Sequence, residues 1–256
     1  RELEKAFAGK QAVGIRVYEP MRRMETADYS DEAVTEGLLE HSFQSFAARV
    51  LSQNSIPTVW TGTGCAGIAF GEAARHLPPD AFEKPLILDL SAAKILHAAG
   101  TDVGIVSFGE RITPEYEFYF RDAETVQLRD SRAFACRLEL CEGAVPDSEW
   151  RDGEGTPLAV SCFTYRNGSG QSFLVLNFDG YAAPAVVAPA SAPESVYRNY
   201  CRPRQLQELA ERLGAVLPVR CYGNPDLYLL CKEGKEETVL GLWNCFADAL
   251  EDAELT

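Results

Sequence analysis

The segment that most constrains the fold is residues 85–105, which read PLILDLSAAKILHAAGTDVGI. An apolar run at residues 86–88 ends at Asp89, and a helical pattern at 91–99 follows at once and ends at Gly100. A second apolar run occupies residues 103–106. This order predicts a strand–helix–strand unit, which is too short for anything except close α/β packing.

Before residue 106, the patterns of the chain alternate between helix and strand. Apolar spacing predicts helices at residues 2–10, 31–53 and 72–77, and strands at 12–18 and 56–60. Such alternation is typical of a parallel, doubly wound sheet. The predicted fold class is therefore α/β.

After residue 106 the predicted elements are mostly strands. They cover residues 116–120, 126–128, 134–141, 158–165 and 172–176, with a hairpin turn at 167–170, a surface loop at 142–155 and a connector at 182–193. One more helix is predicted at residues 203–213, where Pro203 suits the first turn and Gly214 ends it. Two strands at 226–231 and 238–243 follow, so the C-terminal part is expected to be rich in β-structure.

The charge of the chain limits its partners. The net charge is −14, from 38 acidic against 24 basic residues, and no Lys/Arg stripe reverses it locally. We therefore expect no nucleic-acid partner. No apolar run approaches the roughly 18 residues that cross a bilayer, so no membrane partner is expected either.

Cysteine usage and the first residues predict the setting of the chain. The eight cysteines stand mostly in apolar, strand-like runs without a C-x-x-C pair, which is typical of free thiols in a reducing cytoplasm rather than of disulfides or zinc. The N-terminus shows no apolar signal core. It lacks an initiator Met and starts directly with a helical pattern, so we expect the chain to be cut from a longer protein.

A glycine motif offers one alternative function. Gly62, Gly64 and Gly67 fit G-x-G-x-x-G, and Asp89 follows at the distance of a ribose-binding acid, which is the pattern of a dinucleotide-binding domain. Against this, the run after Gly67 is apolar and strand-like, and Gly71 interrupts any helix. The competing interpretation is a glycine-rich turn between strands.

Cys65 offers a second alternative, a thiol-dependent hydrolase. The run 64–67 is close to the G-x-C-x-G pattern of a nucleophile on a sharp turn, but Thr63 replaces the first glycine. A thiol nucleophile also needs a base that a carboxylate orients. The histidines are His41, His76 and His97, and none stands in the adjacent His-x-Glu pair that amidotransferases use. A structural Cys65 is favoured, and no metal constellation is found.

Carboxylates and tryptophans leave a third alternative, a sugar-binding module. A glycosidase needs two carboxylates that face one cleft, which spacing alone does not locate. The candidate acids also suit caps or turns: Asp89, Glu110, Asp179 and Asp248. Trp60, Trp150 and Trp243 could stack on sugar rings, although isolated tryptophans are more often core residues. We therefore assign no catalytic, cofactor-binding or metal-binding residue.

The order of several segments resembles a known non-catalytic module. In the first half these are residues 55–58 (SIPT), 67–77 (GIAFGEAARHL), 86–96 (LILDLSAAKIL) and 100–105 (GTDVGI); in the tail they are 217–218 (LP), 223–228 (GNPDLY) and 241–244 (GLWN). Together they resemble the class I glutamine amidotransferase-like, flavodoxin-like middle domain of bacterial β-galactosidase-type glycoside hydrolases. The similarity covers roughly residues 12–105 and 173–248.

The resemblance implies an architecture and a role. It implies a three-layer amidotransferase-like domain at residues 1–215 and the start of a β-sandwich-like module at 216–256. In that family the catalytic carboxylates lie on a (β/α)₈ barrel, which takes about 250 residues by itself. The middle domain lacks nucleophile and base, packs on the barrel and helps to build the oligomer. The resemblance thus implies a structural domain without cofactor, with a barrel and a homo-oligomer as partners.

Overall fold

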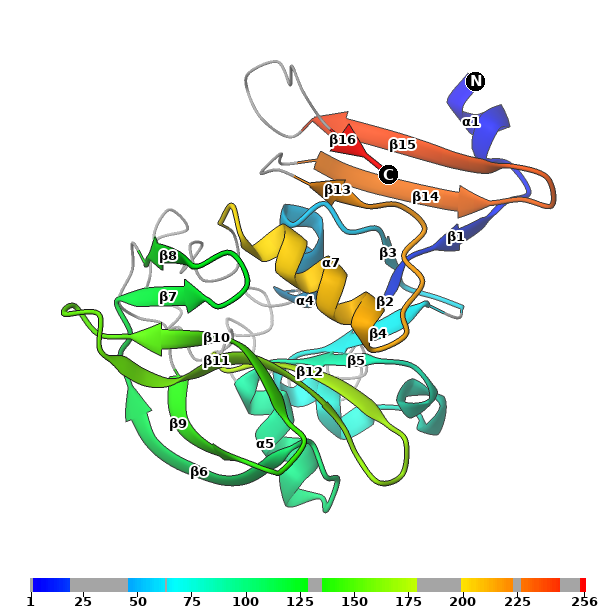
Figure 1. Cartoon of the computed structure of the whole chain (residues 1–256). Coiled ribbons are helices and arrows are strands. Elements are labelled where there is room, and N and C mark those ends of the chain that lie inside the picture. Colours follow the sequence, from blue (N-terminus) through cyan, green and yellow to red (C-terminus); the bar gives the residue numbers. More distant parts are fainter. Residues whose placement is uncertain are drawn as a thin grey trace, which may run out of the picture.

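The computed structural model describes residues 2–18, 46–62, 64–128, 135–178, 199–222, 227–244 and 254–256. Its largest element is a nine-stranded mixed sheet with the strand order β3-β2-β4-β5-β12-β11-β10-β7-β8 (Figure 1). The strands from β3 to β12 are parallel, and those from β12 to β8 are antiparallel. The predicted α/β class is confirmed, and the sheet is mixed rather than parallel throughout.

The parallel half contains five short strands: β2 (Ile15–Tyr18), β3 (Thr58–Val59), β4 (Ala66–Ala69), β5 (Leu86–Leu88) and β12 (Ser172–Leu176). The strands β4, β5 and β12 are buried along their whole lengths. Continuous apolar runs such as LIL at β5 are what a sheet covered on both faces requires.

Helices cover both faces of this sheet (Figure 1). One face packs against α4 (Phe46–Gln53) and α7 (Arg202–Arg212) through Val50, Leu51 and the leucines of α7. The other packs against α5 (Leu90–Ala98) through Ala92, Ala93 and Leu96. The result is an arrangement of three layers. The predicted helix at 31–53 is described only from Phe46 onward, because residues 19–45 lie outside the described ranges.

The antiparallel half contains β7 (Tyr116–Tyr119), β8 (Glu124–Gln127), β10 (Val145–Arg151) and β11 (Pro157–Arg166). The loop predicted at residues 142–155 is wrong, because β10 lies within it. Its inward residues Ser148 and Trp150 are fully buried, whereas the neighbouring Asp147, Glu149 and Arg151 are polar and only partly buried. The sequence does not reveal this strand, because the inward Ser148 is polar and Pro146 stands within the strand, so no apolar alternation is visible.

The predicted unit at residues 85–105 needs one correction. The strand β5, the cap Asp89 and the helix α5 form as expected. However, the next strand, β6 (Ile105–Ile112), pairs antiparallel with β9 (Ala135–Leu140) in a separate two-stranded sheet. The second parallel neighbour of β5 is β12, which comes much later in the chain. The sequence shows two apolar strands on either side of one helix, but it does not indicate which strand each of them pairs with.

Strands from the two ends of the chain pair with each other in a smaller sheet. The predicted strand 12–18 is divided at Gly14 into β1 (Gln11–Val13) and β2, which belong to different sheets. β1 forms a three-stranded sheet with β14 (Leu227–Glu233) and β15 (Thr238–Asn244). Two short strands, β13 (Cys221–Tyr222) and β16 (Glu254–Leu255), also pair. The division at residue 215 stays a prediction.

Three short helices complete the described chain. They are α1 (Glu2–Phe7) and the 3₁₀-helices η1 (Gly71–His76) and η2 (Pro79–Glu83). The hairpin at residues 167–170 is confirmed by the hydrogen bond from Gly170 N to Asn167 O, 2.9 Å. The connector predicted at 182–193 lies outside the described residues. In the described ranges, no helix has the length and apolar character needed to cross a bilayer.

Candidate functional site

Cys65 lies at the amino end of β4, directly before Ala66. Its backbone N–H donates to Gly14 O at 2.9 Å, and its side chain is half-buried. Burial raises the pKa of the thiol to about 11, so the protonated form dominates at neutral pH. Within the described ranges, no hydrogen bond joins Cys65 to an imidazole, and the ring of His97 instead packs edge-on against Phe108 at 5.3 Å.

The G-x-G-x-x-G motif runs into the strand β4 rather than into a helix. Gly67 lies inside β4 opposite Arg16 of β2, and a Cβ there would stand 2.6 Å from the Tyr18 ring. A Cβ on Gly64 would stand 2.6 Å from the backbone nitrogen of Arg16. These glycines allow β4 to approach β2 closely. A dinucleotide site needs the opposite order, with a helix N-terminus directly after the glycines.

Asp89 acts as the N-cap of α5. Its Oδ1 accepts hydrogen bonds from Ala92 N at 2.8 Å and from Gly71 N at 2.9 Å, and the residue is fully buried. The carboxylate therefore joins the start of α5 to the start of η1. The interpretation of Asp89 as a capping residue is confirmed, and the geometry assigns this oxygen to backbone groups of the chain.

A buried ion pair that sequence reasoning missed lies in the antiparallel half. Arg202, in the first turn of α7, places Nη2 2.5 Å from Oε2 of Glu117 on β7, and both side chains are 0% exposed. Two hydroxyl groups donate to Oε1 of Glu117, from Ser148 of β10 at 2.8 Å and from Ser161 of β11 at 2.7 Å. The Tyr119 hydroxyl donates to Oε2 at 2.8 Å.

Two amide side chains complete this network. Asn199 accepts hydrogen bonds from the backbone N–H groups of Cys201 and Arg202, and donates to the Tyr119 hydroxyl at 3.0 Å. Gln205 accepts from Arg202 and donates to Ser148 at 3.0 Å. Burial is the largest single effect and by itself would lower the pKa of Arg202, but the Glu117 carboxylate together with the nearby Tyr119 and Cys162 raises the pKa overall. The ion pair is thus held charged by internal partners, which is the behaviour of a structural cluster.

The sequence carries little signal for this cluster. Glu117 stands between Tyr116 and Phe118 and looks like a surface residue of a strand. Arg202 precedes Pro203 at a helix start, where an exposed charge is ordinary. The partners come together only because β7 pairs with β10, β10 pairs with β11, and the start of α7 packs against these strands.

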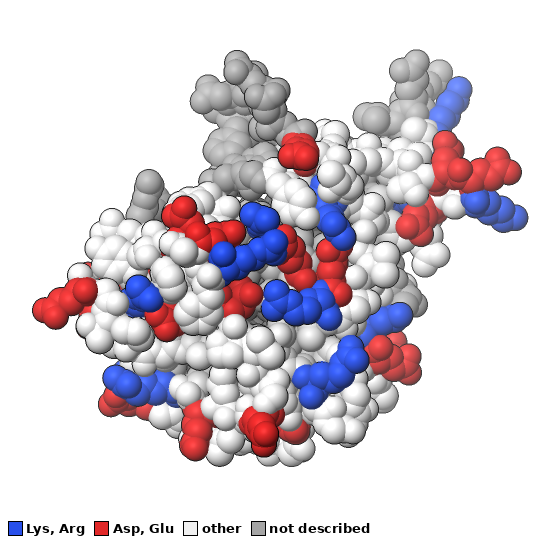
Figure 2. Space-filling model, in the orientation of Figure 1, with Lys and Arg blue, Asp and Glu red and all other residues white. Residues whose placement is uncertain are grey.

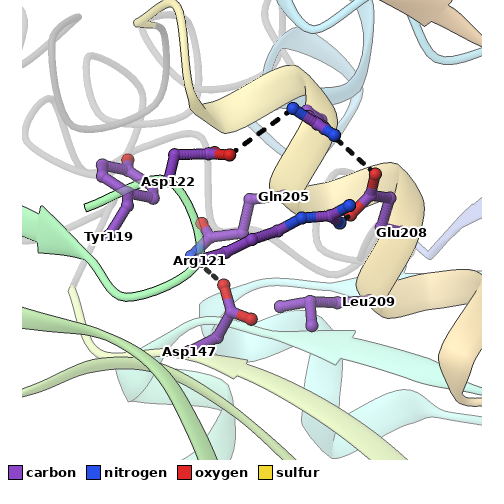
Figure 3. A pocket seen from close by; sticks show the side chains of 8 residues that line it. Tyr119, Arg121, Asp122, Asp147, Gln205, Glu208 and Leu209 are labelled. Carbon is purple, nitrogen blue, oxygen red and sulfur yellow. Dashed lines mark hydrogen bonds and ion pairs between the residues drawn. The ribbon is translucent and has the colours of Figure 1, made fainter. Parts of the chain in front are cut away.

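A small pocket lies beside this network, between α7 and the turn after β7 (Figure 3). Its lining includes Arg121, Asp122, Arg204 and Glu208, with Asp147 below. Arg121 pairs with Glu208, and Arg204 pairs with Asp122 at 3.4 Å and Glu208 at 3.1 Å. The cavity measures about 10 Å³, about the space of one water molecule. The pocket is therefore too small for a sugar ring.

The charged surface around the pocket is mixed. On the face shown in Figure 2, Lys and Arg side chains lie among Asp and Glu side chains. Across the described ranges, no group of three or more His, Cys, Asp or Glu side chains is arranged to hold a metal ion.

The three tryptophans lie in different environments. Trp150 is buried and donates from Nε1 to Asn177 O at 2.9 Å, so it belongs to the core. Trp60 and Trp243 are 51% and 41% exposed. Trp243 packs beside Tyr228 with the ring centroids 5.8 Å apart and the ring planes tilted by 59°. These two rings are tilted, so they do not form one continuous flat surface.

No protein-family model and no curated protein matches this sequence. Solved structures with some likeness include Gan42B, a GH42 beta-galactosidase from G. stearothermophilus, and its catalytic mutant. Both are 12% identical over 91% of this chain and 34% of theirs, with TM-scores of 0.47 and 0.48. Exo-beta-1,4-mannosidase Op5Man5 from Opitutaceae bacterium strain TAV5 is 16% identical over 84% of this chain and 38% of its own, with a TM-score of 0.39. The chain spans about a third of the length of these structures.

Proposed function

We propose that this chain is a non-catalytic, architectural domain of a larger bacterial glycoside hydrolase of the β-galactosidase type. The observation that carries the proposal is the order of the five parallel strands. Counted along the chain, the order β3-β2-β4-β5-β12 is 2-1-3-4-5, which is the order of flavodoxin-like folds. This order supports the amidotransferase-like domain that the sequence resembles.

The position of Cys65 supports a role without catalysis. In open α/β sheets, reacting groups and ligands gather at the carboxyl ends of the parallel strands. Cys65 lies at the amino end of β4, and burial raises the pKa of its thiol to about 11. A thiol in this state is a poor nucleophile at neutral pH. The state of Cys65 thus supports placing the chemistry of the proposed enzyme on another part of it.

The proposal includes partners. A catalytic (β/α)₈ barrel in the same protein would pack on this domain, and a second copy of the chain would associate with it in a cytoplasmic homo-oligomer. The net charge of −14 disfavours a nucleic-acid partner.

Two measurements test the proposal. The first is hydrolysis of 4-nitrophenyl β-galactoside and β-mannoside by this chain, by its Cys65→Ala variant and by the full-length product of the gene. We expect release by the full-length product alone. The second is thermal unfolding of that product with and without residues 1–256, where we expect the deletion to lower the melting temperature of the barrel. Hydrolysis that depends on Cys65, or a full-length product without a barrel, would overturn the proposal.

A further inference from the structure

The outer edge of β15 is open in the described part of the chain. β15 is the last strand of the sheet β1-β14-β15, and no described strand pairs with its far side. Three of the other sheet edges are short: β1 has three residues, β3 has two, and β8 has four. The edges of the sheet β6-β9 are longer, with eight and six residues, but both strands carry charged side chains, Glu110 and Arg111 on β6 and Arg137 and Glu139 on β9. β15 has seven. Long open edges are templates for pairing with another chain.

The hairpin register shows which backbone groups point outward from this edge. Gly234 N donates to Glu237 O at 2.8 Å, so residues 234 and 237 form a hydrogen-bonded pair at the turn. Hydrogen-bonded and non-hydrogen-bonded pairs alternate along an antiparallel ladder. The pairs that Thr238, Leu240 and Leu242 form with β14 are therefore non-hydrogen-bonded pairs. The backbone N–H and C=O groups of these three residues point away from β14.

The side chains of β15 suit contact with another protein strand. The strand reads TVLGLWN and contains no ionisable residue and no proline, although the chain carries a net charge of −14. Leu242 is 49% exposed. Charged residues and prolines are the usual protection of an edge, and β15 has neither.

We propose that this edge pairs antiparallel with β15 of a second copy of the chain, which joins two three-stranded sheets across a two-fold axis at Leu240. This inference deepens the assembly role proposed above by naming its surface. In this register Leu240 lies opposite Leu240 and Thr238 opposite Leu242, so the outward groups form about six backbone hydrogen bonds. Leu242 is covered by the second copy.

The absence of charge on β15 supports a second copy of the chain as its partner. Two strongly acidic chains repel one another over most of their surfaces. Pairing β15 with itself brings no like charges together within the strand, because residues 238–244 carry none. A C2 interface also requires a patch that is complementary to itself. An uncharged strand with its outward groups at 238, 240 and 242 meets that requirement.

Light scattering on the full chain tests the pairing. At about 100 μM, which populates interfaces of micromolar Kd, we expect twice the chain mass of 28.1 kDa. Leu242→Pro removes only an outward N–H and leaves the ladder with β14 intact, so it should halve the mass with little change in circular dichroism. Leu242→Lys should do the same. Val216→Lys, at a residue 81% exposed outside β15, makes the same charge change and should remain dimeric.

Cross-linking tests the register. The double variant Thr238→Cys/Leu242→Cys should form a disulfide-linked dimer under mild oxidation, because these positions face each other across the axis. Each single variant and the unmodified chain should not. A monomeric unmodified chain, or Leu242 variants that stay dimeric, would overturn the inference. Either result leaves the glycoside measurements unaffected, and hydrolysis that depends on Cys65 would overturn the proposed function without changing the mass.

Discussion

At residues 64–67, the close approach of β4 to β2 determines which residues fit. A Cβ on Gly64 or on Gly67 would stand 2.6 Å from atoms of Arg16 or Tyr18, so these positions serve packing. Cys65 lies between them and is half-buried. Its thiol loses part of its hydration there, which disfavours the charged thiolate and raises its pKa.

This environment predicts slow alkylation of Cys65. When the pKa rises from 9 to about 11, the thiolate fraction at pH 7 falls about 100-fold, and the greater nucleophilicity of the more basic thiolate restores about tenfold. Iodoacetamide should therefore modify Cys65 about tenfold more slowly in the folded chain than in urea, measured by peptide mass spectrometry at pH 7. Because the folded-state pKa is raised, the rate should rise as the pH approaches 11. Faster reaction in the folded chain would contradict this account.

At the scale of the elements, β1 and β2 belong to different sheets and are separated by a single residue, Gly14. The φ of Gly14 is +154°. Its carbonyl accepts the hydrogen bond from Cys65 N, and the next residue, Ile15, donates to Pro57 O at 2.9 Å. The chain therefore passes from the three-stranded sheet to the nine-stranded sheet within one residue, where only a glycine fits without strain.

Gly14→Ala should destabilise the protein. The added Cβ would stand 2.2 Å from Pro57 O, a backbone atom that moves only if β3 moves. We expect the free energy of unfolding to fall by about 1–3 kcal/mol, measured by urea denaturation. Gly168→Ala is the matched control, because a Cβ there meets nothing within 4 Å. Equal effects of the two substitutions would show that the close approach at Gly14 is not important for stability.

At the scale of the whole molecule, the ion pair of Glu117 and Arg202 connects α7 to the antiparallel half of the large sheet. Arg202 begins α7, and Glu117 lies on β7 with hydroxyl donors from β10 and β11. The cluster therefore joins one helix to three strands. Each charge is buried, so neither can be hydrated if its partner is removed.

Glu117→Gln should therefore be costly. The substitution keeps the shape but leaves the Arg202 charge buried without its carboxylate, so we expect a loss of about 3–5 kcal/mol in the free energy of unfolding, measured by urea denaturation. Glu72→Gln is the control. Its pair with Arg75 has side chains 48% and 58% exposed, so the loss should be within about 0.5 kcal/mol.

A double variant separates charge from packing. Glu117→Gln/Arg202→Met removes both charges while the Gln carbonyl still accepts from Ser148 and Ser161, so it should be more stable than Glu117→Gln alone. A double variant as unstable as the sum of the two single variants would assign the effect to packing instead.

Local signals in the sequence predicted the elements that depend on nearby residues. The run at residues 86–88, the cap at Asp89 and the helix that follows agree with β5 and α5. The hairpin turn at 167–170 and the helix starting near Pro203 were also predicted correctly. In each case the interactions that define the element join residues only a few positions apart, so these residues are close in space because they are close in sequence.

Contacts between distant residues decided the rest. The pairing of β5 with β12, the separate sheet of β6 and β9, and the strand β10 depend on partners far along the chain. The ion pair joins residues separated by 85 positions, and neither one signals the other in the sequence. Sequence patterns record which side chains prefer burial, but strand pairing is a competition among all available edges. Only the folded chain resolves that competition, because the free energy of each pairing depends on what packs above and below it.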